Sequence, residues 1–192
     1  MPPVEVNTLH FAAKRFTDTP FPPYRFIPGR HPHPIAHPQG HSHRPPGQPE
    51  PSVEPVPPER WPQSQPYLFG CDLYNHGFWW ESHEAWEGLW RVVPADSARR
   101  RYLQGIIQIA AIHLQLFQGH AEGVARLRIT SREHLAAAAA AQGQQLPFMG
   151  IDILELQRRI DDYCERVLDA KMPPPWHLPR FFPYIIPSER FP

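Results

Sequence analysis

The chain contains few cysteines, no excess of either charge and no long apolar run. Its two cysteines, Cys71 and Cys164, form no framework of paired thiols, which excludes a disulfide-stapled fold and suits a reducing compartment. The 19 basic and 19 acidic residues balance, so no domain-wide positive field favours nucleic acid or an anionic membrane. Residues 102–117, the most apolar segment, are too few and too polar to span a bilayer, and residues 1–16 lack the apolar run of a signal peptide. We therefore expect a soluble, cytoplasmic protein with no nucleic-acid or membrane partner.

Proline is nearly absent from the middle of the chain and abundant at both ends. Eighteen of the 27 prolines fall in residues 1–66, whereas only Pro94 and Pro147 interrupt residues 67–171. Proline removes a backbone donor and clashes with helix geometry. We therefore expect a Pro/His-rich extended N-terminal arm at residues 1–66, a helical domain at 67–171 and an extended C-terminal arm at 172–192.

Helical periodicity and capping residues predict four helices in the central domain. They run from about Cys71 to Arg91, from Asp96 or Ser97 to about Gln118, from about Ala121 to Gln142, and from about Asp152 to Ala170. No period-2 strand or internal repeat is present. The sequence predicts an all-α fold, a compact antiparallel helical bundle of about four helices, with the second helix the most buried.

The segment from His83 to Trp90 combines potential metal ligands with bulky aromatic residues. With about 100° per residue, Glu87 falls about 40° from His83 on a helical wheel, and His76 and Asp72 fall within about 20°. The four nearby tryptophans share that face, so we expect the ionisable groups to be buried and either paired or bound to a metal.

A histidine and a carboxylate four residues apart can bind one metal, as the two histidines of HExxH do. The pair His83 and Glu87 suits zinc, iron or manganese about equally. At least one more ligand is needed, and we expect it to be His76 or the arm residues His33 and His41. The alternative is a His83–Glu87 hydrogen bond that only orients side chains inside the core. Both interpretations remain open at this point.

Polar side chains elsewhere could orient these ligands. Gln104 and Gln108 lie close together around the second helix, where buried amides would need partners. With Asn75 and Trp90 they form the expected second shell of a metal site. Gly105 would allow close approach of the first helix.

The N-terminal arm has two readings of its own. It contains five closely spaced histidines: His31, His33, His37, His41 and His43. By composition the arm could be a disordered linker. Its aromatic residues, among them Phe21, Tyr24 and Phe26, instead indicate an arm that docks on the bundle. We expect the same of the C-terminal arm, which contains Trp176, Phe181, Phe182 and Tyr184.

The core also resembles a known family, the bacterial and archaeal domain of unknown function 309. That family is marked by the pattern His-x-x-x-Glu-x-x-Trp/Tyr, preceded by Asn-x-Gly and followed by Gln-Gly-(Leu/Ile)-Ile-Gln. The matching residues are His83, Glu87, Trp90, Asn75, Gly77 and the run Gln104–Gln108. The resemblance covers about residues 67–142 and implies a helical bundle with a suggested metal-binding role, but no assigned reaction.

Three function classes follow. The first is a small metalloprotein, a metal-dependent hydrolase of an unknown small molecule, in which Glu84 is the catalytic acid or base. The second is a non-catalytic interaction or homo-oligomerisation module in which the His–Glu pair is structural. Nucleic-acid binding is the weakest, because the run Arg99–Arg101 has no interleaved aromatic residues.

Overall fold

The predicted all-α fold is confirmed by the computed structural model, which describes residues 13–48, 53–143, 147–169 and 182–188. The helices are η2 (Pro58–Gln63), α1 (Gln65–Asn75), α2 (Trp79–Val92), α3 (Ala98–Gln118), α4 (Ala121–Ala141) and α5 (Ile153–Asp169). No strand occurs in the described residues, where the nearest feature is one isolated bridge between Phe148 and Ile151. The described part of the predicted N-terminal arm is not extended throughout. It forms turns, in which for example Arg30 N donates to the Ile27 carbonyl and His37 N donates to the His33 carbonyl. It also forms η2, where prolines occupy early helical positions that need no backbone donor, and its last two residues belong to α1.

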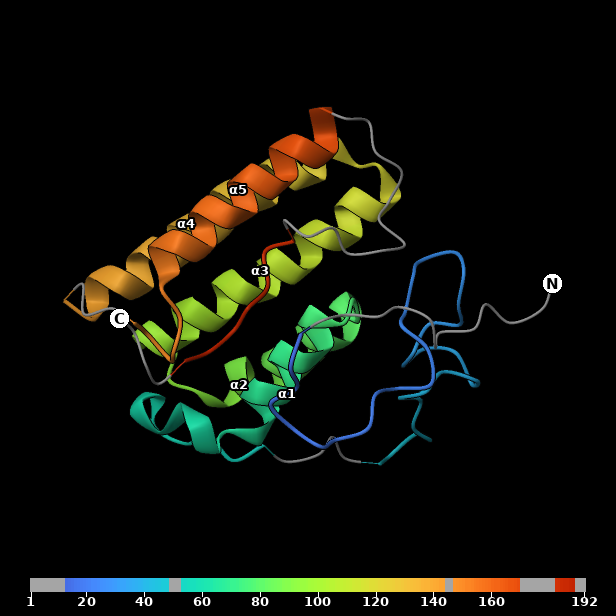
Figure 1. Ribbon diagram of the computed structural model, residues 1–192. Coiled ribbons are helices and arrows are strands. Elements are labelled where there is room, and N and C mark those ends of the chain that lie inside the picture. Colours follow the sequence, from blue (N-terminus) through green and yellow to red (C-terminus); the bar gives the residue numbers. More distant parts are fainter. Residues whose placement is uncertain (1–12, 49–52, 144–146, 170–181, 189–192) are drawn as a thin grey trace.

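Helix α3 is central and lies against α2, α4 and α5 (Figure 1). It begins where the Ser97 hydroxyl accepts a hydrogen bond from Arg100 N at 3.1 Å, and it ends at Gly119, whose φ of 73° is left-handed. Ile106 and Ile109 are 0% and 1% exposed. The two central isoleucines are buried as predicted. The prediction that this helix is the most buried holds for the number of buried residues but not for the fraction, because 12 of the 21 residues of α3 are buried against 8 of the 11 of α1.

The predicted single helix from Cys71 to Arg91 is wrong. The chain leaves α1 after Asn75 and starts α2 at Trp79. Gly77 lies between them with a φ of 80°, a conformation that side-chain-bearing residues rarely adopt and that ends the first helix. The helical-wheel relation between His76 and the residues of α2 therefore does not hold.

Two glycines let helices approach closely. A Cβ on Gly70 of α1 would lie 2.2 Å from the Trp86 Nε1 atom of α2, and one on Gly105 of α3 would lie 2.5 Å from Leu135 Cγ of α4. The close approach at Gly105 was expected to involve the first helix, and this expectation is wrong. It is α4 that packs there.

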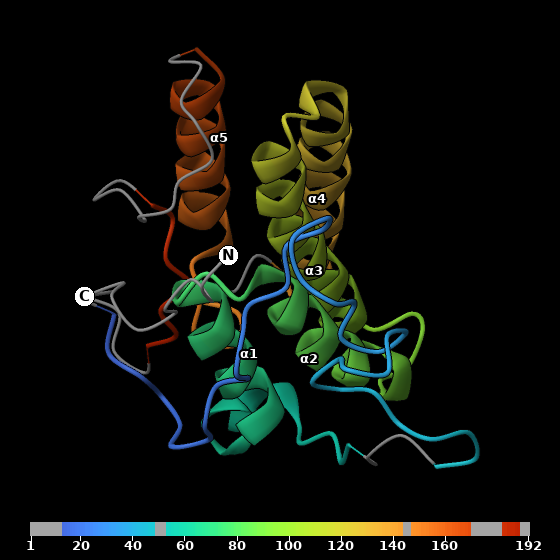
Figure 2. The same ribbon diagram turned by 90° about the vertical axis from the view of Figure 1, so that its right-hand side faces the viewer.

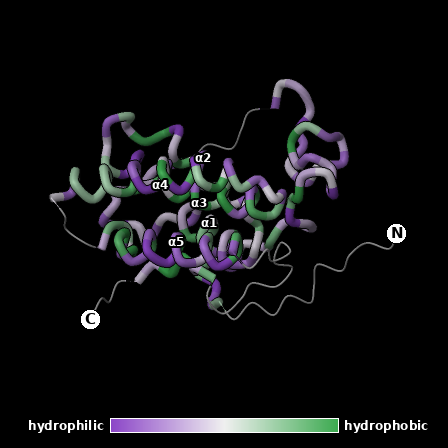
Figure 3. The backbone as a smooth tube through the Cα atoms, turned by 90° about the horizontal axis from the view of Figure 1, so that it is seen from above, coloured by the Kyte–Doolittle hydropathy of each residue, from purple (hydrophilic) through white to green (hydrophobic). Residues whose placement is uncertain are grey.

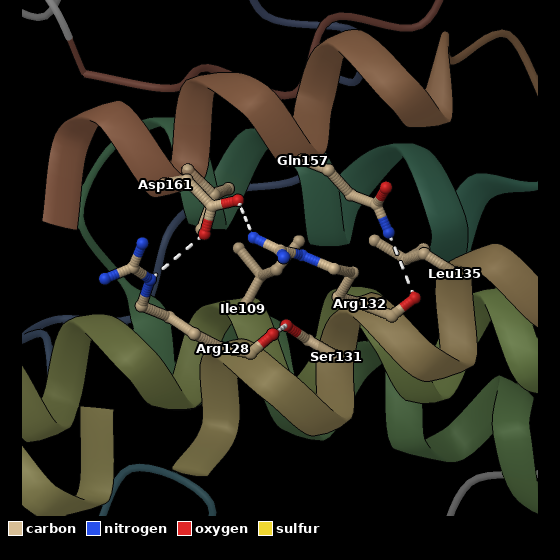
Figure 4. A pocket seen from close by; sticks show the side chains of 8 residues that line it. Ile109, Arg128, Ser131, Arg132, Leu135, Gln157 and Asp161 are labelled. Atoms are coloured by element: carbon tan, nitrogen blue, oxygen red, sulfur yellow. Dashed lines mark hydrogen bonds and ion pairs between the residues drawn. The ribbon is translucent and has the colours of Figure 1, made fainter. Parts of the chain in front are cut away.

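Helices α4 and α5 lie side by side and are joined by polar contacts (Figures 1 and 4). The Asp161 carboxylate accepts hydrogen bonds from Arg128, at 3.0 Å from Nε, and from Arg132. Gln157 Nε2 donates to the Arg132 carbonyl at 3.0 Å. Apolar side chains of α5 fill the core below these contacts: Ile153, Leu156, Ile160, Tyr163, Cys164 and Val167. The third and fourth helices predicted from the sequence correspond to α4 and α5. Both are confirmed, and their ends lie within a residue or two of the predicted positions.

The N-terminal arm docks on α1 and α2 (Figures 1 and 2). The buried Asp72 carboxylate accepts hydrogen bonds from Phe16 N at 2.7 Å, Thr17 N at 2.9 Å and Thr17 Oγ1 at 2.7 Å. Phe26 is only 8% exposed. Docking of the described part of this arm is confirmed, because its backbone donors and an aromatic side chain are both buried against the bundle.

The C-terminal segment docks through Asn75. Its side-chain amide accepts a hydrogen bond from Ile185 N at 2.8 Å and donates one to the Ile185 carbonyl at 2.7 Å. The Asn75 side chain thus forms the two hydrogen bonds that the backbone of a neighbouring strand would form. Phe182 is fully buried, which confirms docking at this point. Trp176 and Phe181, which were expected to dock as well, lie outside the described residues.

Apolar and polar residues alternate along the helices (Figure 3), so each helix turns one face inward. None of the helices in the described part of the chain combines the length and the apolarity that crossing a bilayer requires.

Candidate metal centre

Helix α2 places three potential metal ligands together on its outer side. His83, Glu84 and Glu87 each offer one nitrogen or oxygen atom, and these atoms lie within 4.8 Å of one another. No other group of three or more such side chains gathers in the part of the chain that the structure describes. Positions i, i+1 and i+4 of one helix turn bring them there.

The cluster is half-buried rather than enclosed among tryptophans. The side chains of His83 and Glu87 are 31% and 27% exposed, whereas Trp79 and Trp86 are almost completely buried. The expectation that ligands and core tryptophans share one buried face is therefore wrong. The buried residues of α2 are Trp79, Glu81, Ser82, Trp86 and Leu89, so His83 and Glu87 lie beside the buried face of the helix and not on it.

Glu87 already has two partners. Its Oε2 atom lies 3.5 Å from His83 Nε2, and its Oε1 atom lies 3.2 Å from Arg91 Nη2. Burial lowers the pKa of His83, while the neighbouring Glu87 carboxylate opposes that shift and Arg91 adds to it. The neutral imidazole favoured by burial is the form that binds metals.

The other predicted ligands lie elsewhere. His76, His33 and His41 are absent from the group of neighbouring ligand atoms. His76 follows α1, and its Nδ1 atom donates to the Asp72 carbonyl at 2.8 Å. Asp72, which the helical wheel also placed beside His83, binds the N-terminal arm instead.

The two arm histidines contact α2 one turn before the cluster. His41 Nε2 lies 3.0 Å from Glu81 Oε1, and both side chains are about 95% buried, with exposed fractions of 5% and 4%. Phe26 N donates to the same Glu81 oxygen at 2.7 Å. The His33 ring packs against Trp80, and its Nδ1 atom accepts backbone N–H groups of the arm. Both histidines therefore hold the arm in place.

The four expected supporting residues also have other roles. Asn75 binds the C-terminal segment, and the Trp90 ring lies under the Arg100 guanidinium at 3.7 Å. Neither Gln104 nor Gln108 forms a hydrogen bond with His83 or Glu87 within the described ranges, and Gln108 Oε1 is buried without a partner. These side chains therefore do not orient His83 and Glu87 through hydrogen bonds.

Two contacts were missed in the sequence. Arg91 lies four residues after Glu87, a spacing that predicts an ion pair on a helix. Glu81 gave no comparable signal, because its partners Phe26 and His41 are 55 and 40 residues away. Only the path of the arm brings them together.

Chemically, the cluster offers one imidazole and two carboxylates from one side of a helix. A metal held by three ligands from one side would keep its other coordination positions open to water or a small molecule, as catalytic rather than structural sites do. Histidine and carboxylate ligands suit zinc, iron and manganese.

Comparison with known proteins supports the resemblance seen in the sequence. The model of a family described as Domain of unknown function (DUF309) matches residues 67–127. The match spans α1, α2 and α3 and the beginning of α4, and so contains the whole cluster. No curated protein matches the chain. No solved structure matches it.

Proposed function

We propose that the protein binds one divalent metal ion on α2 through His83, Glu84 and Glu87. The observation that carries this proposal is the gathering of three ligand atoms within 4.8 Å. Zinc, iron and manganese are the candidate ions, because an imidazole with two carboxylates suits all three. The family match at residues 67–127 contains all three ligand residues.

The role of Glu84 changes in this proposal. From the sequence it was expected to act as an acid or base beside the metal. Its place among the neighbouring ligand atoms favours direct coordination instead, since a carboxylate that ligates a metal has less basicity left for proton transfer.

The positive charge of Arg91 opposes metal binding as long as its side chain stays beside Glu87. Its guanidinium lies 3.2 Å from Glu87 and would repel a cation placed at the same carboxylate. The Arg91 side chain is 45% exposed, so it can turn into solvent when a cation arrives. Binding should therefore exchange the Arg91 contact of Glu87 for a metal contact.

Such a site would suit metal-assisted hydrolysis of a small molecule. A bound divalent ion would polarise a substrate oxygen or lower the pKa of a bound water. The half-exposed cluster would leave room for that substrate, and His83 and Glu87 would hold the ion.

A second function is favoured by one specific observation. The chain of contacts from His83 through Glu87 to Arg91 balances the carboxylate without any metal. In that case the domain is a non-catalytic interaction or homo-oligomerisation module, and the three side chains are a surface ion-pair network.

Elemental analysis separates the two functions. The full chain is purified without a histidine tag, and its metal content is measured before and after titration with zinc, iron(II) and manganese. We expect one ion per chain in the native protein and its loss in His83→Ala and in Glu87→Ala. His43→Ala is the matched control, because His43 is exposed and its Nδ1 atom donates to the Ile35 carbonyl.

A native protein that contains no metal and takes up none on titration would contradict the proposal. Equal loss of metal in His43→Ala would instead place binding on the histidine-rich arm. Unchanged metal in both cluster variants would place binding outside the cluster and would contradict the proposal.

A further inference from the structure

A cleft of about 270 Å³ lies at a different place in the fold from the metal-ligand cluster. It is formed by η2, the C-terminal end of α4, the turn at residues 147–150 and Ser188. None of the three cluster residues lines it. Its volume approaches that of ligand-binding pockets for small molecules.

One wall of the cleft is a tight turn. Met149 has a φ of 47° and Gly150 a φ of 77°, between the bridged residues Phe148 and Ile151. A left-handed conformation costs a residue such as Met149 on the order of 1 kcal/mol or more and persists only where its surroundings impose it. Here the Tyr67 hydroxyl donates to the Met149 carbonyl at 2.9 Å. The wall is therefore held in place before any ligand arrives.

A second wall of the cleft is aromatic. Trp61 of η2 lies against the turn so closely that a Cβ on Gly150 would be 2.6 Å from its ring. The indole remains half-buried, so part of it faces the cleft. A half-exposed indole attracts cations through the negative face of its ring.

Among the described residues, the charge that lines the cleft has one sign. Glu59 is the only charged residue of the described part of the chain that lines it. No residue that the structure describes forms a hydrogen bond or an ion pair with Glu59. Gln142 caps the C-terminus of α4 at the cleft, and the C-terminal end of a helix carries the negative end of its dipole. Both features attract a positive charge.

Arg99, a basic group on which the charge of Glu59 acts, does not fill this place. Arg99 is influenced by the charge of Glu59, which raises its pKa against the lowering caused by burial. However, Arg99 does not line the cleft, and its guanidinium donates to the Val56 carbonyl. The carboxylate of Glu59 thus stays exposed to a second cation.

We propose that this cleft binds a small organic ammonium ion, with Glu59 as the opposing charge and Trp61 as the aromatic wall. The site is independent of the proposed metal centre. The volume excludes a folded macromolecule, and the mixture of one carboxylate with apolar walls fits an alkylated amine better than a hydrated metal ion.

The test is calorimetric titration of the full chain with choline and with its uncharged carbon isostere, dimethylbutanol. We expect saturable binding of choline and much weaker binding of the alcohol. Glu59→Gln should weaken choline binding by about tenfold or more, which corresponds to ~1.4 kcal/mol. Because Glu59 is exposed, this variant should fold, and its melting temperature checks that it does.

Two control variants isolate the cleft. Glu54→Gln removes an exposed carboxylate from the same segment but outside the cleft, and it should bind choline like the native chain. Glu87→Gln removes a proposed metal ligand and should also leave choline binding unchanged. Trp61→Phe, which keeps an aromatic ring, should weaken binding less than Trp61→Leu does.

Three results would overturn the proposal. They are no saturable binding of choline, equal affinity for the uncharged isostere, and native affinity in Glu59→Gln. Each of them would leave the metal proposal untouched, because that proposal is read from metal content.

Discussion

At the scale of single residues, His113 is a buried histidine held neutral by its surroundings. It is 1% exposed and packs against the rings of Trp79 and Phe182. Its Nε2 atom lies 2.8 Å from the Tyr74 hydroxyl, which itself donates to the Pro183 carbonyl. Nε2 therefore carries the proton and donates to Tyr74. Burial lowers the pKa of His113 from its usual 6.5 to about 3.

This residue should make the folded state sensitive to acid. Above pH 6.5 His113 is neutral in both the folded and the unfolded chain. The free energy of unfolding is then not reduced by protonation of this residue. As the pH falls from 6.5 towards 3, the unfolded chain binds a proton that the folded chain excludes. The free energy of unfolding should then fall by up to about 1.4 kcal/mol per pH unit from this group.

Urea denaturation of the native chain and of His113→Gln between pH 7 and pH 4 measures this effect. Glutamine can still donate to Tyr74 but does not titrate, so the variant should show a shallower loss of stability. Parallel pH profiles of the two proteins would contradict the role given to His113.

At the scale of elements, glycine decides how closely the helices pack. Gly105 lets α3 approach α4, since its Cβ position lies 2.5 Å from Leu135. Gly88 of α2 sits in the same kind of secondary structure, yet a Cβ there would meet only Val53, at an ordinary 3.5 Å. The two glycines therefore differ in packing and share their helical context.

The same substitution should consequently have opposite effects. Gly105→Ala should lower the free energy of unfolding by about 1–3 kcal/mol through overpacking. Gly88→Ala should raise it by roughly 0.5–1 kcal/mol, because alanine favours helix over glycine. Thermal or urea unfolding of both variants measures the difference. Stabilisation by Gly105→Ala would show that α4 is not tightly packed there.

At the scale of the whole molecule, both arms are bound by residues that lie close to the break between α1 and α2. Asp72 and Glu81, one on each side of the break, accept backbone donors of the N-terminal arm. Asn75, at the end of α1, pairs with both backbone groups of Ile185. Segments from opposite ends of the chain thus meet on the same two helices (Figure 2).

Removing one anchor should release one arm. Asn75→Ala leaves the buried N–H and C=O groups of Ile185 without partners, at a cost of about 1–3 kcal/mol each. Hydrogen exchange of residues 182–188 should become faster, while exchange in α3 and in the N-terminal arm stays slow. Gln118→Ala, at an exposed position of α3, is the control. Uniformly faster exchange throughout the chain would show that Asn75 stabilises the whole bundle and not one arm.

Much of the fold could be predicted because its signals are local. Ser97 and Gly119 mark the ends of α3, and the spacing of apolar residues along α5 requires no knowledge of partners. The break at Gly77 was missed, since an isolated glycine is compatible with a helix as well as with its end. That one error wrongly placed His76 and Asp72 on the predicted ligand face.

By itself the sequence determined the all-helical class, most helix ends and the neighbouring positions of His83 and Glu87, and its aromatic residues indicated that the arms dock. All of these depend on contacts within a turn or on the cost of exposing apolar rings. Only the tertiary structure decided that His41 binds Glu81, that Asn75 binds Ile185, and that Glu59 and Trp61 meet Met149 at a cleft. The physical reason is separation along the chain, because the path of an extended arm over a bundle is set by many weak contacts that no local pattern records.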